Sequence, residues 1–395
     1  MPWMEASAMS LRHEFLTFAR RPDRNLRALC RRFGISPKTG YKWIARGRPS
    51  SISDDGNDGV GDDPLADRSR RPHSSPGKTT ESVEHLVCDL RRRHPAWGGR
   101  KIHARLLALG HADVPAASTV TDILRRHGLI DPAESLKHTP LVRFEHLQPN
   151  DLWQMDFVGH FPLEDGTRCH TLTVLDDHSR YCLTIKACAN ETGATVRNHL
   201  TDAFRRYGVP RRILCDNGSP WGTKGCEDMD HRYTTLGVWL IRMGVRLGHG
   251  RPYHPQTQGK DERFNRTVKA EVIGTRRFVD LPDVQHHADP WRDVYNLQRP
   301  HEALGMNTPA SRYAPSPHAF LEQLPPIEYG PGDVVRRVSA DGYFHYKTVR
   351  YKVSQAFTGQ PIALRQTRQI DGQLDVFFCH QRIATIDLRT NTRIS

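Results

Sequence analysis

The sequence predicts a multidomain protein with N-terminal all-α helix-turn-helix units, a central α/β mixed sheet and a small C-terminal β-barrel. Three observations lead to this fold class. Helical patterns separated by glycine turns fill the first 130 residues. From about residue 150, β-rich runs alternate with helical segments. Residues 325–390 contain short alternating strands joined by Asp-Gly turns, which are typical of small barrels.

The composition excludes some functional classes and favours one. Hydrophobic residues make up 37% of the 395-residue chain and charged residues 26%, so packed domains are expected. The net charge of +13 favours an anionic partner, either nucleic acid or an anionic membrane. No apolar run approaches the ~20 residues that span a bilayer, and the N-terminus does not resemble a signal peptide. We therefore expect a cytoplasmic protein that binds nucleic acid and no membrane.

The eight cysteines form no C-x-x-C pair and no zinc-finger spacing. We expect reduced, mostly buried thiols and no structural zinc site.

Residues 1–48 are predicted to form a helix-turn-helix domain. A first short helix carries an apolar stripe, a tight turn forms at Gly34, and Ser36 caps a second helix. The second helix places three cations on one face, with Tyr41 and Ile44 facing the other way. This layout predicts DNA binding through the second helix, and the alternative is a plain helical hairpin with a basic face. The three predicted DNA-binding residues are Lys38, Lys42 and Arg46.

Four further segments surround the central part of the chain. Residues 49–78 are expected to be a flexible linker because they lack apolar mass and begin with a run rich in Gly, Ser and Asp. Residues 79–130 are expected to form a second helical DNA-binding unit whose last helix is capped by Ser118. Residues 131–148 would be another linker. Residues 325–390 would form the β-barrel-like domain, with turns at Asp341-Gly342 and Asp371-Gly372.

Two aspartates in the central part, residues 149–315, are candidates for chemistry. Asp156 lies inside an apolar strand, where a buried carboxylate needs a metal, a partner or solvent. Asp216 ends an apolar strand at an Asn-Gly turn, where active sites tend to form, although an Asx-turn that ends the strand is the alternative. An acid on the helix expected within residues 254–273 would add a third oxygen ligand. Oxygen-only sites suit Mg²⁺ or Mn²⁺, and two such ions ~4 Å apart can promote phosphodiester cleavage.

Five sequence blocks resemble one known family. They are WQMDF, TVLDDHSRY, CDNGSPW, HPQTQGKDERFNRTVKAE and YNLQRPHEALGMNTPASRY. These blocks, in this order, look like the signature of the DDE transposases of bacterial insertion sequences. The resemblance implies a retroviral-integrase-type catalytic core with an RNase H-like fold. The zinc domain of retroviral integrases is absent, so the resemblance is to the bacterial branch.

The resemblance implies that Asp156, Asp216 and Glu262 are the catalytic residues and the ligands of Mg²⁺ or Mn²⁺, with two ions. Glu262 matches the glutamate of the G-x-x-E-R block, which selects it over Asp261. Helical spacing places Glu262, Asn265, Arg266 and Lys269 on one polar face and predicts that Asp261 is solvated. Arg266 and Lys269 are expected to contact DNA phosphates.

The chain departs from the family pattern in two places. The spacing between Asp216 and Glu262 is long, and we assign the excess to the polar loop at 219–233, whose Glu227, Asp228 and Asp230 are alternative ligands. Gln258-Gly259 stands where the family often has Asn-Gly.

Other residues keep two interpretations each. Asp176 and Asp177 either support the metal ligands or form a hairpin turn. His254 lies either near the scissile phosphate or in an ordinary turn. Arg299 and His301 either contact DNA or cap a helix in the core.

The predicted function is that of a transposase. It would bind the terminal inverted repeats of its element, cut double-stranded DNA at the ends, and join the freed 3′-OH to target DNA. Cutting two ends implies a homodimer or higher oligomer, and the protein would be nucleoid-associated when bound to DNA. The alternatives are an RNase H-fold nuclease without strand transfer and a non-catalytic helix-turn-helix DNA-binding regulator.

Overall fold

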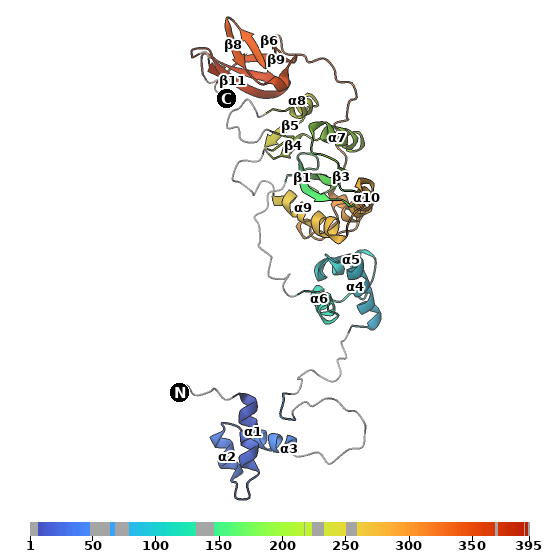
Figure 1. Cartoon of the computed structure of the whole chain (residues 1–395), viewed down its shortest axis with the longest axis vertical. Helices are drawn as coiled ribbons and strands as arrows, with labels where there is room; N and C mark the ends of the chain where they lie inside the picture. Colours follow the sequence, from blue (N-terminus) through green and yellow to red (C-terminus); the bar gives the residue numbers. More distant parts are fainter. Residues whose placement is uncertain are drawn as a thin grey trace. The chain divides into compact units, whose positions relative to one another are not determined.

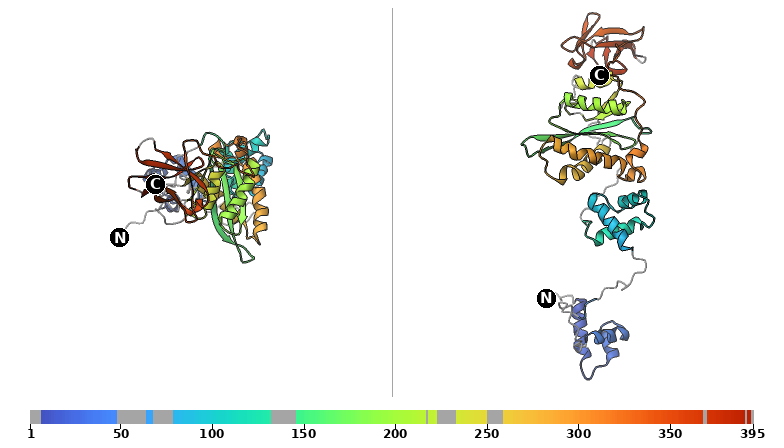
Figure 2. Two further views of the ribbon diagram at one scale, coloured as in Figure 1. Left: turned by 90° about the horizontal axis from the view of Figure 1, so that it is seen from above. Right: turned by 90° about the vertical axis from the view of Figure 1, so that its right-hand side faces the viewer.

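The structure, a computed structural model, describes residues 7–47, 64–67, 79–131, 146–216, 218–222, 233–249, 259–367, 370–390 and 392–393. The chain divides into two compact units, residues 1–78 and 79–395, and each is described by itself (Figures 1 and 2). Across the described ranges, no helix is both long and apolar enough to cross a membrane.

The N-terminal unit contains the predicted helix-turn-helix together with a helix that the sequence did not reveal. Its helices are α1 (Ala8–Ala19), α2 (Leu26–Arg32) and α3 (Pro37–Arg46). Gly34 has a φ of 64°, and the Ser36 hydroxyl accepts a hydrogen bond from the backbone N–H of Thr39 at 3.2 Å, as expected for a cap. The core consists of Phe15, Leu16, Ala19, Cys30, Trp43 and Leu65. The core-facing aromatic residue of α3 is therefore Trp43, whereas Tyr41 is 65% exposed.

A three-helix bundle begins the second unit. It comprises α4 (Glu81–Arg93), α5 (Gly99–Ala108) and α6 (Ala117–Arg126), packed around the buried Trp97. The expected cap at Ser118 is wrong: the residue before α6 is Ala116, and no side chain caps the helix. Gly99 is required where α5 approaches α6, because a Cβ there would lie 2.1 Å from the Thr121 hydroxyl.

A five-stranded mixed sheet forms the centre of the second unit. The strands are β1 (Trp153–Pro162), β2 (Arg168–Asp176), β3 (Cys182–Cys188), β4 (Arg212–Cys215) and β5 (Arg246–His249). They are ordered β3-β2-β1-β4-β5. The β1–β2 and β2–β3 pairs are antiparallel, whereas β1–β4 and β4–β5 are parallel. The carboxyl ends of β1 and β4 therefore point the same way.

Helices cover both faces of this sheet (Figures 1 and 2). One face packs on α7 (Gly193–Tyr207) and α8 (Thr235–Arg242) through a cluster that includes Trp153 and Met155 of β1. The other face packs on α9 (Gly259–Glu271) and α10 (Leu281–Leu297). Short 3₁₀ turns follow at Ile273–Thr275, Glu302–Leu304 and Pro309–Arg312. The central domain is thus a three-layer α/β/α sandwich.

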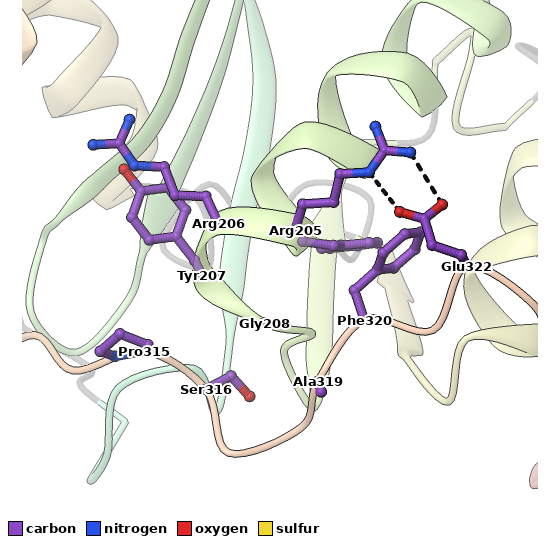
Figure 3. A pocket seen from close by; sticks show the side chains of 10 residues that line it. Arg205, Arg206, Tyr207, Gly208, Pro315, Ser316, Ala319, Phe320 and Glu322 are labelled. Atoms are coloured by element: carbon purple, nitrogen blue, oxygen red, sulfur yellow. Dashed lines mark hydrogen bonds and ion pairs between the residues drawn. The ribbon is translucent and has the colours of Figure 1, made fainter.

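The segment that leaves the central domain crosses the end of α7 (Figure 3). The backbone N–H of Ser316 donates to the Tyr207 carbonyl, and Val209 donates to the His318 carbonyl, both at 2.7 Å. Gly208, with a φ of 77°, is required because a Cβ would lie 2.8 Å from two carbonyl oxygens of this segment. A hollow of about 370 Å³ opens here beside the Arg205–Glu322 ion pair, and none of the three predicted catalytic acids lines it.

The C-terminal module is a sheet and a hairpin. Its strands are β6 (Val334–Arg337), β7 (Tyr343–Tyr346), β8 (Val349–Lys352), β9 (Pro361–Gln366), β10 (Gln373–Phe378), β11 (Gln381–Asp387) and β12 (Thr392–Arg393), with a 3₁₀ turn at Gln355–Phe357. The five-stranded sheet has the order β12-β11-β10-β9-β6, and β7–β8 pair separately. Among the described strands no closed barrel forms, because β6 and β12 remain edges of the open sheet. The core of the module also includes Val238 and Ile241 of α8, and Tyr233, which lies two residues before that helix begins.

Candidate active site

Asp156 and Asp216 belong to neighbouring parallel strands. Trp153 pairs with Ile213 and Gln154 with Leu214, so the same register continued by two residues brings Asp156 beside Asp216. Since Trp153 and Met155 face the α7–α8 layer, the alternation of a strand turns Gln154 and Asp156 towards α9. The fold therefore delivers two carboxylates to one end of the sheet, under the first turns of α9.

Asp156 is half-buried and lies among other acidic groups. The Asn265 side-chain amide on α9 donates a hydrogen bond to Asp156 Oδ2 at 2.9 Å. Burial, followed by the charge of Asp216, raises the pKa of Asp156 to about 6. A buried carboxylate with a second acid beside it is expected where a cation is to be held or a proton shared.

Asp216 forms the Asx-turn that the sequence left open. Its Oδ1 accepts a hydrogen bond from the backbone N–H of Gly218 at 3.0 Å. This bond fixes the direction of the carboxylate at the end of β4. The turn and a role in metal binding are compatible, because a carboxylate has lone pairs for both a turn and a metal.

The start of α9 differs from the sequence prediction in one respect. Asp261, expected to be solvated, is only 4% exposed, and among the described residues its Oδ1 has no hydrogen-bond partner. The physical reason is helical period: Asp261 shares the buried face of α9 with Phe264, Asn265 and Val268. Burial and then the charges of Asp156 and Glu262 raise the pKa of Asp261 well above its usual range.

Glu262 is exposed in the first turn of α9. It lies three residues before Asn265, so it shares a helix, and nearly a face, with the amide that contacts Asp156. Among the residues that the structure describes, no three His, Cys, Asp or Glu side chains are grouped closely enough to hold a metal ion. Asn265 contacts Asp156 directly, and the register of β1 and β4 brings Asp216 beside Asp156, whereas Glu262 is exposed in the first turn of α9.

The donor set fits a hard divalent cation. Asp156, Asp216 and Glu262 offer only oxygen atoms, which suit Mg²⁺ or Mn²⁺. The pKa of Asp156 is raised first by burial and then by the charge of Asp216, and a bound cation would favour the charged carboxylate.

The predicted DNA-contacting cations lie at the surface. Lys38 and Lys42 are exposed on α3, and Arg46 is half-buried with its guanidinium 5.0 Å from the Trp43 ring centre. Arg266 and Lys269 are exposed on α9. All five are accessible to a large anionic partner.

Arg299 and His301 lie in the interior of the protein. Arg299 is 6% exposed and forms a buried ion pair with Glu271 at the end of α9. Burial lowers the pKa of His301 well below its usual range, and its Nε2 has no hydrogen-bond partner within the part of the chain that the structure describes. Of the two interpretations left open by the sequence, the structure favours packing in the core over contact with DNA.

The two hairpin aspartates have different surroundings. Asp176 accepts hydrogen bonds from the backbone N–H groups of Ser179 and Asn150, at 2.8 and 2.7 Å, as a turn residue does. Asp177 instead contacts α9, a link that sequence reasoning missed. The remaining candidates, His254, Glu227, Asp228 and Asp230, lie outside the described residues.

Comparisons with known families agree with an integrase-like central sheet and an N-terminal helix-turn-helix region. Residues 146–255 and 243–309 match integrase core domain models. Residues 333–393 match the C-terminal domain of IS481 family transposases, and residues 39–124 match a homeodomain-like domain.

Two insertion-element proteins and one solved integrase structure are similar to this chain. The chain is 26% identical to an insertion element IS407 protein of 31.7 kDa from Burkholderia multivorans, over 63% of this chain and 89% of that protein. It is 30% identical to an insertion element IS476 protein of 39.2 kDa from Xanthomonas euvesicatoria, over 41% of this chain and 44% of that protein. A solved structure of the HTLV-2 integrase catalytic core in complex with magnesium aligns at 16% identity with a TM-score of 0.32, over 42% of this chain and 97% of that one.

The integrase core and the insertion-element relatives support a polynucleotidyl transferase of the DDE transposase and integrase class. Together with the IS481-type C-terminal domain, they support a transposase of the kind encoded by bacterial insertion sequences.

Proposed function

We propose that this transposase binds the terminal inverted repeats of its element, cleaves the DNA at both ends, and joins each 3′-OH to target DNA. The observation that carries the proposal is the pair Asp156 and Asp216 on adjacent parallel strands, whose mutual repulsion helps raise the pKa of Asp156 to about 6. Such a pair is suited to holding divalent cations at the point where phosphoryl transfer takes place.

Each residue has a defined part in this proposal. Asp156, Asp216 and Glu262 would hold Mg²⁺ or Mn²⁺, two ions in all. Bound there, such ions would supply charge stabilisation for the attacking oxygen, from water in cleavage and from the 3′-OH in joining, and for the leaving oxygen. Asn265 would orient the Asp156 carboxylate through its hydrogen bond to Oδ2.

The surrounding domains would supply the DNA. Helix α3 would bind the terminal repeat through Lys38, Lys42 and Arg46. The helices α4–α6 would form a second DNA-binding unit. Arg266 and Lys269 would contact phosphates next to the catalytic acids. Because two ends have to be cut together, a homodimer or higher oligomer on DNA is proposed.

The test is cleavage of labelled DNA that flanks the protein's own gene, with Mg²⁺ or Mn²⁺. Asp156→Asn and Glu262→Gln should abolish cleavage while binding to the repeat survives. Asp261→Asn is the matched control, because it changes the adjacent buried acid, and it should retain cleavage. Unchanged cleavage in Asp156→Asn and Glu262→Gln would overturn the assignment, and loss in Asp261→Asn alone would move the third ligand to Asp261.

A second assay separates strand transfer from hydrolysis. With pre-cut ends and a target plasmid, the wild type should produce joined products. Cleavage without joining would define a nuclease, and repeat binding without metal-dependent cleavage would define a regulator.

A further inference from the structure

The Asp177 carboxylate is a buried junction between three elements. It is 2% exposed and follows the end of β2. Its Oδ1 accepts a hydrogen bond from the Gln154 side-chain amide at 2.8 Å. Its Oδ2 accepts one from the backbone N–H of His146 at 2.9 Å and lies 2.6 Å from Lys260 Nζ.

The partners of Asp177 are close in sequence to the predicted metal ligands. Gln154 lies on β1 two residues before Asp156, and since side chains alternate along a strand, both lie on the face towards α9. Lys260 lies on α9 two residues before Glu262. The Asp177 carboxylate therefore links β1, which carries Asp156, to the first turn of α9, which carries Glu262.

The ion pair between Lys260 and Asp177 is well shielded from water. The Lys260 side chain is 16% exposed and that of Asp177 is 3% exposed. Arg180 is a second cation beside Asp177. Its guanidinium donates a hydrogen bond to the Asp177 backbone carbonyl at 2.6 Å and lies 4.0 Å from Asp177 Oδ1. Buried pairs of this kind contribute little net stability, but they define geometry strongly because each partner is costly to leave alone.

We propose that Lys260 and Asp177 are positioning residues that set the place of Glu262 relative to Asp156 and Asp216. The Asn265–Asp156 hydrogen bond fixes α9 one turn further along, and the Lys260–Asp177 pair fixes its first turn. Glu262 lies between these two attachments. The inference rests on the proposed function, because the position of Glu262 matters in this way only if Glu262 binds metal.

The experiment measures DNA cleavage by the full-length protein as a function of Mg²⁺ concentration. Lys260→Met removes the cation from the first turn of α9 and leaves Asp177 with Gln154, His146 and Arg180. We expect the half-saturating Mg²⁺ concentration to rise about tenfold or more, the usual effect of losing a group that orients a metal ligand. Lys260→Arg keeps the charge and should restore most of the affinity. Repeat binding, measured in EDTA, should stay unchanged in both variants.

Arg299→Met is the matched control. It breaks another buried ion pair of α9, with Glu271 at the opposite end of the helix. We expect a lower melting temperature but a Mg²⁺ dependence close to that of the wild type. If Lys260→Met does not fold, Lys260→Gln, which retains a hydrogen-bond donor, replaces it in the Mg²⁺ titration.

Three results would overturn the inference. Lys260→Met and Lys260→Gln could show the wild-type Mg²⁺ dependence. Arg299→Met could raise the Mg²⁺ requirement equally, which would assign the effect to general loosening of α9. Loss of repeat binding without a change in Mg²⁺ dependence would make Lys260 a DNA contact. Asp156→Asn in the same assay tests the proposed function separately, because it should be inactive at every Mg²⁺ concentration.

Discussion

Charged side chains differ in their exposure to water between the central sheet, where acids are withdrawn from it, and helix α3, where lysines are exposed. Near the sheet, Asp156 and Asp261 are withdrawn from water and stand among other acids, so their pKa values are raised. On α3, Lys38 and Lys42 extend into solvent. Exposed cations of this kind cost little free energy to place.

This difference separates two functions. A surface that meets DNA phosphates needs cations that are free to adapt, and their effect is screened by salt. A site that holds metal ions needs acids fixed close together, and their repulsion persists until a cation is bound. The folded protein therefore has an unfavourable electrostatic energy at the buried acids of the central site and little such energy at the exposed cations of α3.

The largest effect is expected at the core of the N-terminal unit. Trp43→Ala removes the aromatic side chain that anchors α3, at a cost of about 3–5 kcal/mol. Because the two units are compact by themselves, repeat binding should be lost while the larger unit keeps its melting transition. Calorimetry with a DNA-binding assay checks this. A shift of both transitions together would show that the units fold cooperatively.

Asp216→Asn should act only at the sheet. The change removes one carboxylate and should reduce cleavage about a hundredfold or more, as loss of a metal-binding group does. It should also lower the pKa of Asp156, since Asp216 is the principal charge that raises it. Cleavage rates and the carboxyl pKa by NMR test the two parts. An unchanged Asp156 pKa would show that burial alone accounts for the shift.

Asp156→Asn should make the metal-free protein more stable. In the folded state the pKa is about 6, against 3.8 for an ordinary aspartate, so the charged form costs at most about 3 kcal/mol. Above pH 6 the neutral variant avoids this full cost. The gain shrinks as pH falls from 6 towards 3.8 and vanishes below, where Asp156 is protonated in both states. Urea unfolding in EDTA at several pH values measures it, and a destabilised variant at pH 7 would contradict the account.

The smallest effect is expected for Lys42→Ala. Loss of one phosphate-contacting cation should reduce the slope of log affinity against log salt by about 1, without changing stability or Mg²⁺ dependence. The measurement is repeat binding across a range of salt concentrations. Glu262→Gln, tested alongside in EDTA, should leave that slope intact.

Sequence reasoning worked best where a local pattern decides the structure. The alternating runs predicted β1 to β3, and the Asn-Gly turn placed Asp216 at a strand end. It failed for Asp261 because helical spacing was used only to separate Asp261 from the polar face of Glu262, whereas Asp261 lies on the buried face with Phe264 and Val268. It could not find the Lys260–Asp177 contact, because a pairing between residues 83 positions apart is set by the tertiary fold.

The central claim is tested most directly by the melting temperature of the protein as Mn²⁺ is added without DNA. If Asp156 and Asp216 are held together for divalent ions, the wild type should gain about 2.7 kcal/mol at a hundred times the dissociation constant. Asp216→Asn should gain little. A wild-type melting temperature that does not respond to Mn²⁺, or an equal rise in Asp216→Asn, would contradict a metal site between these strands.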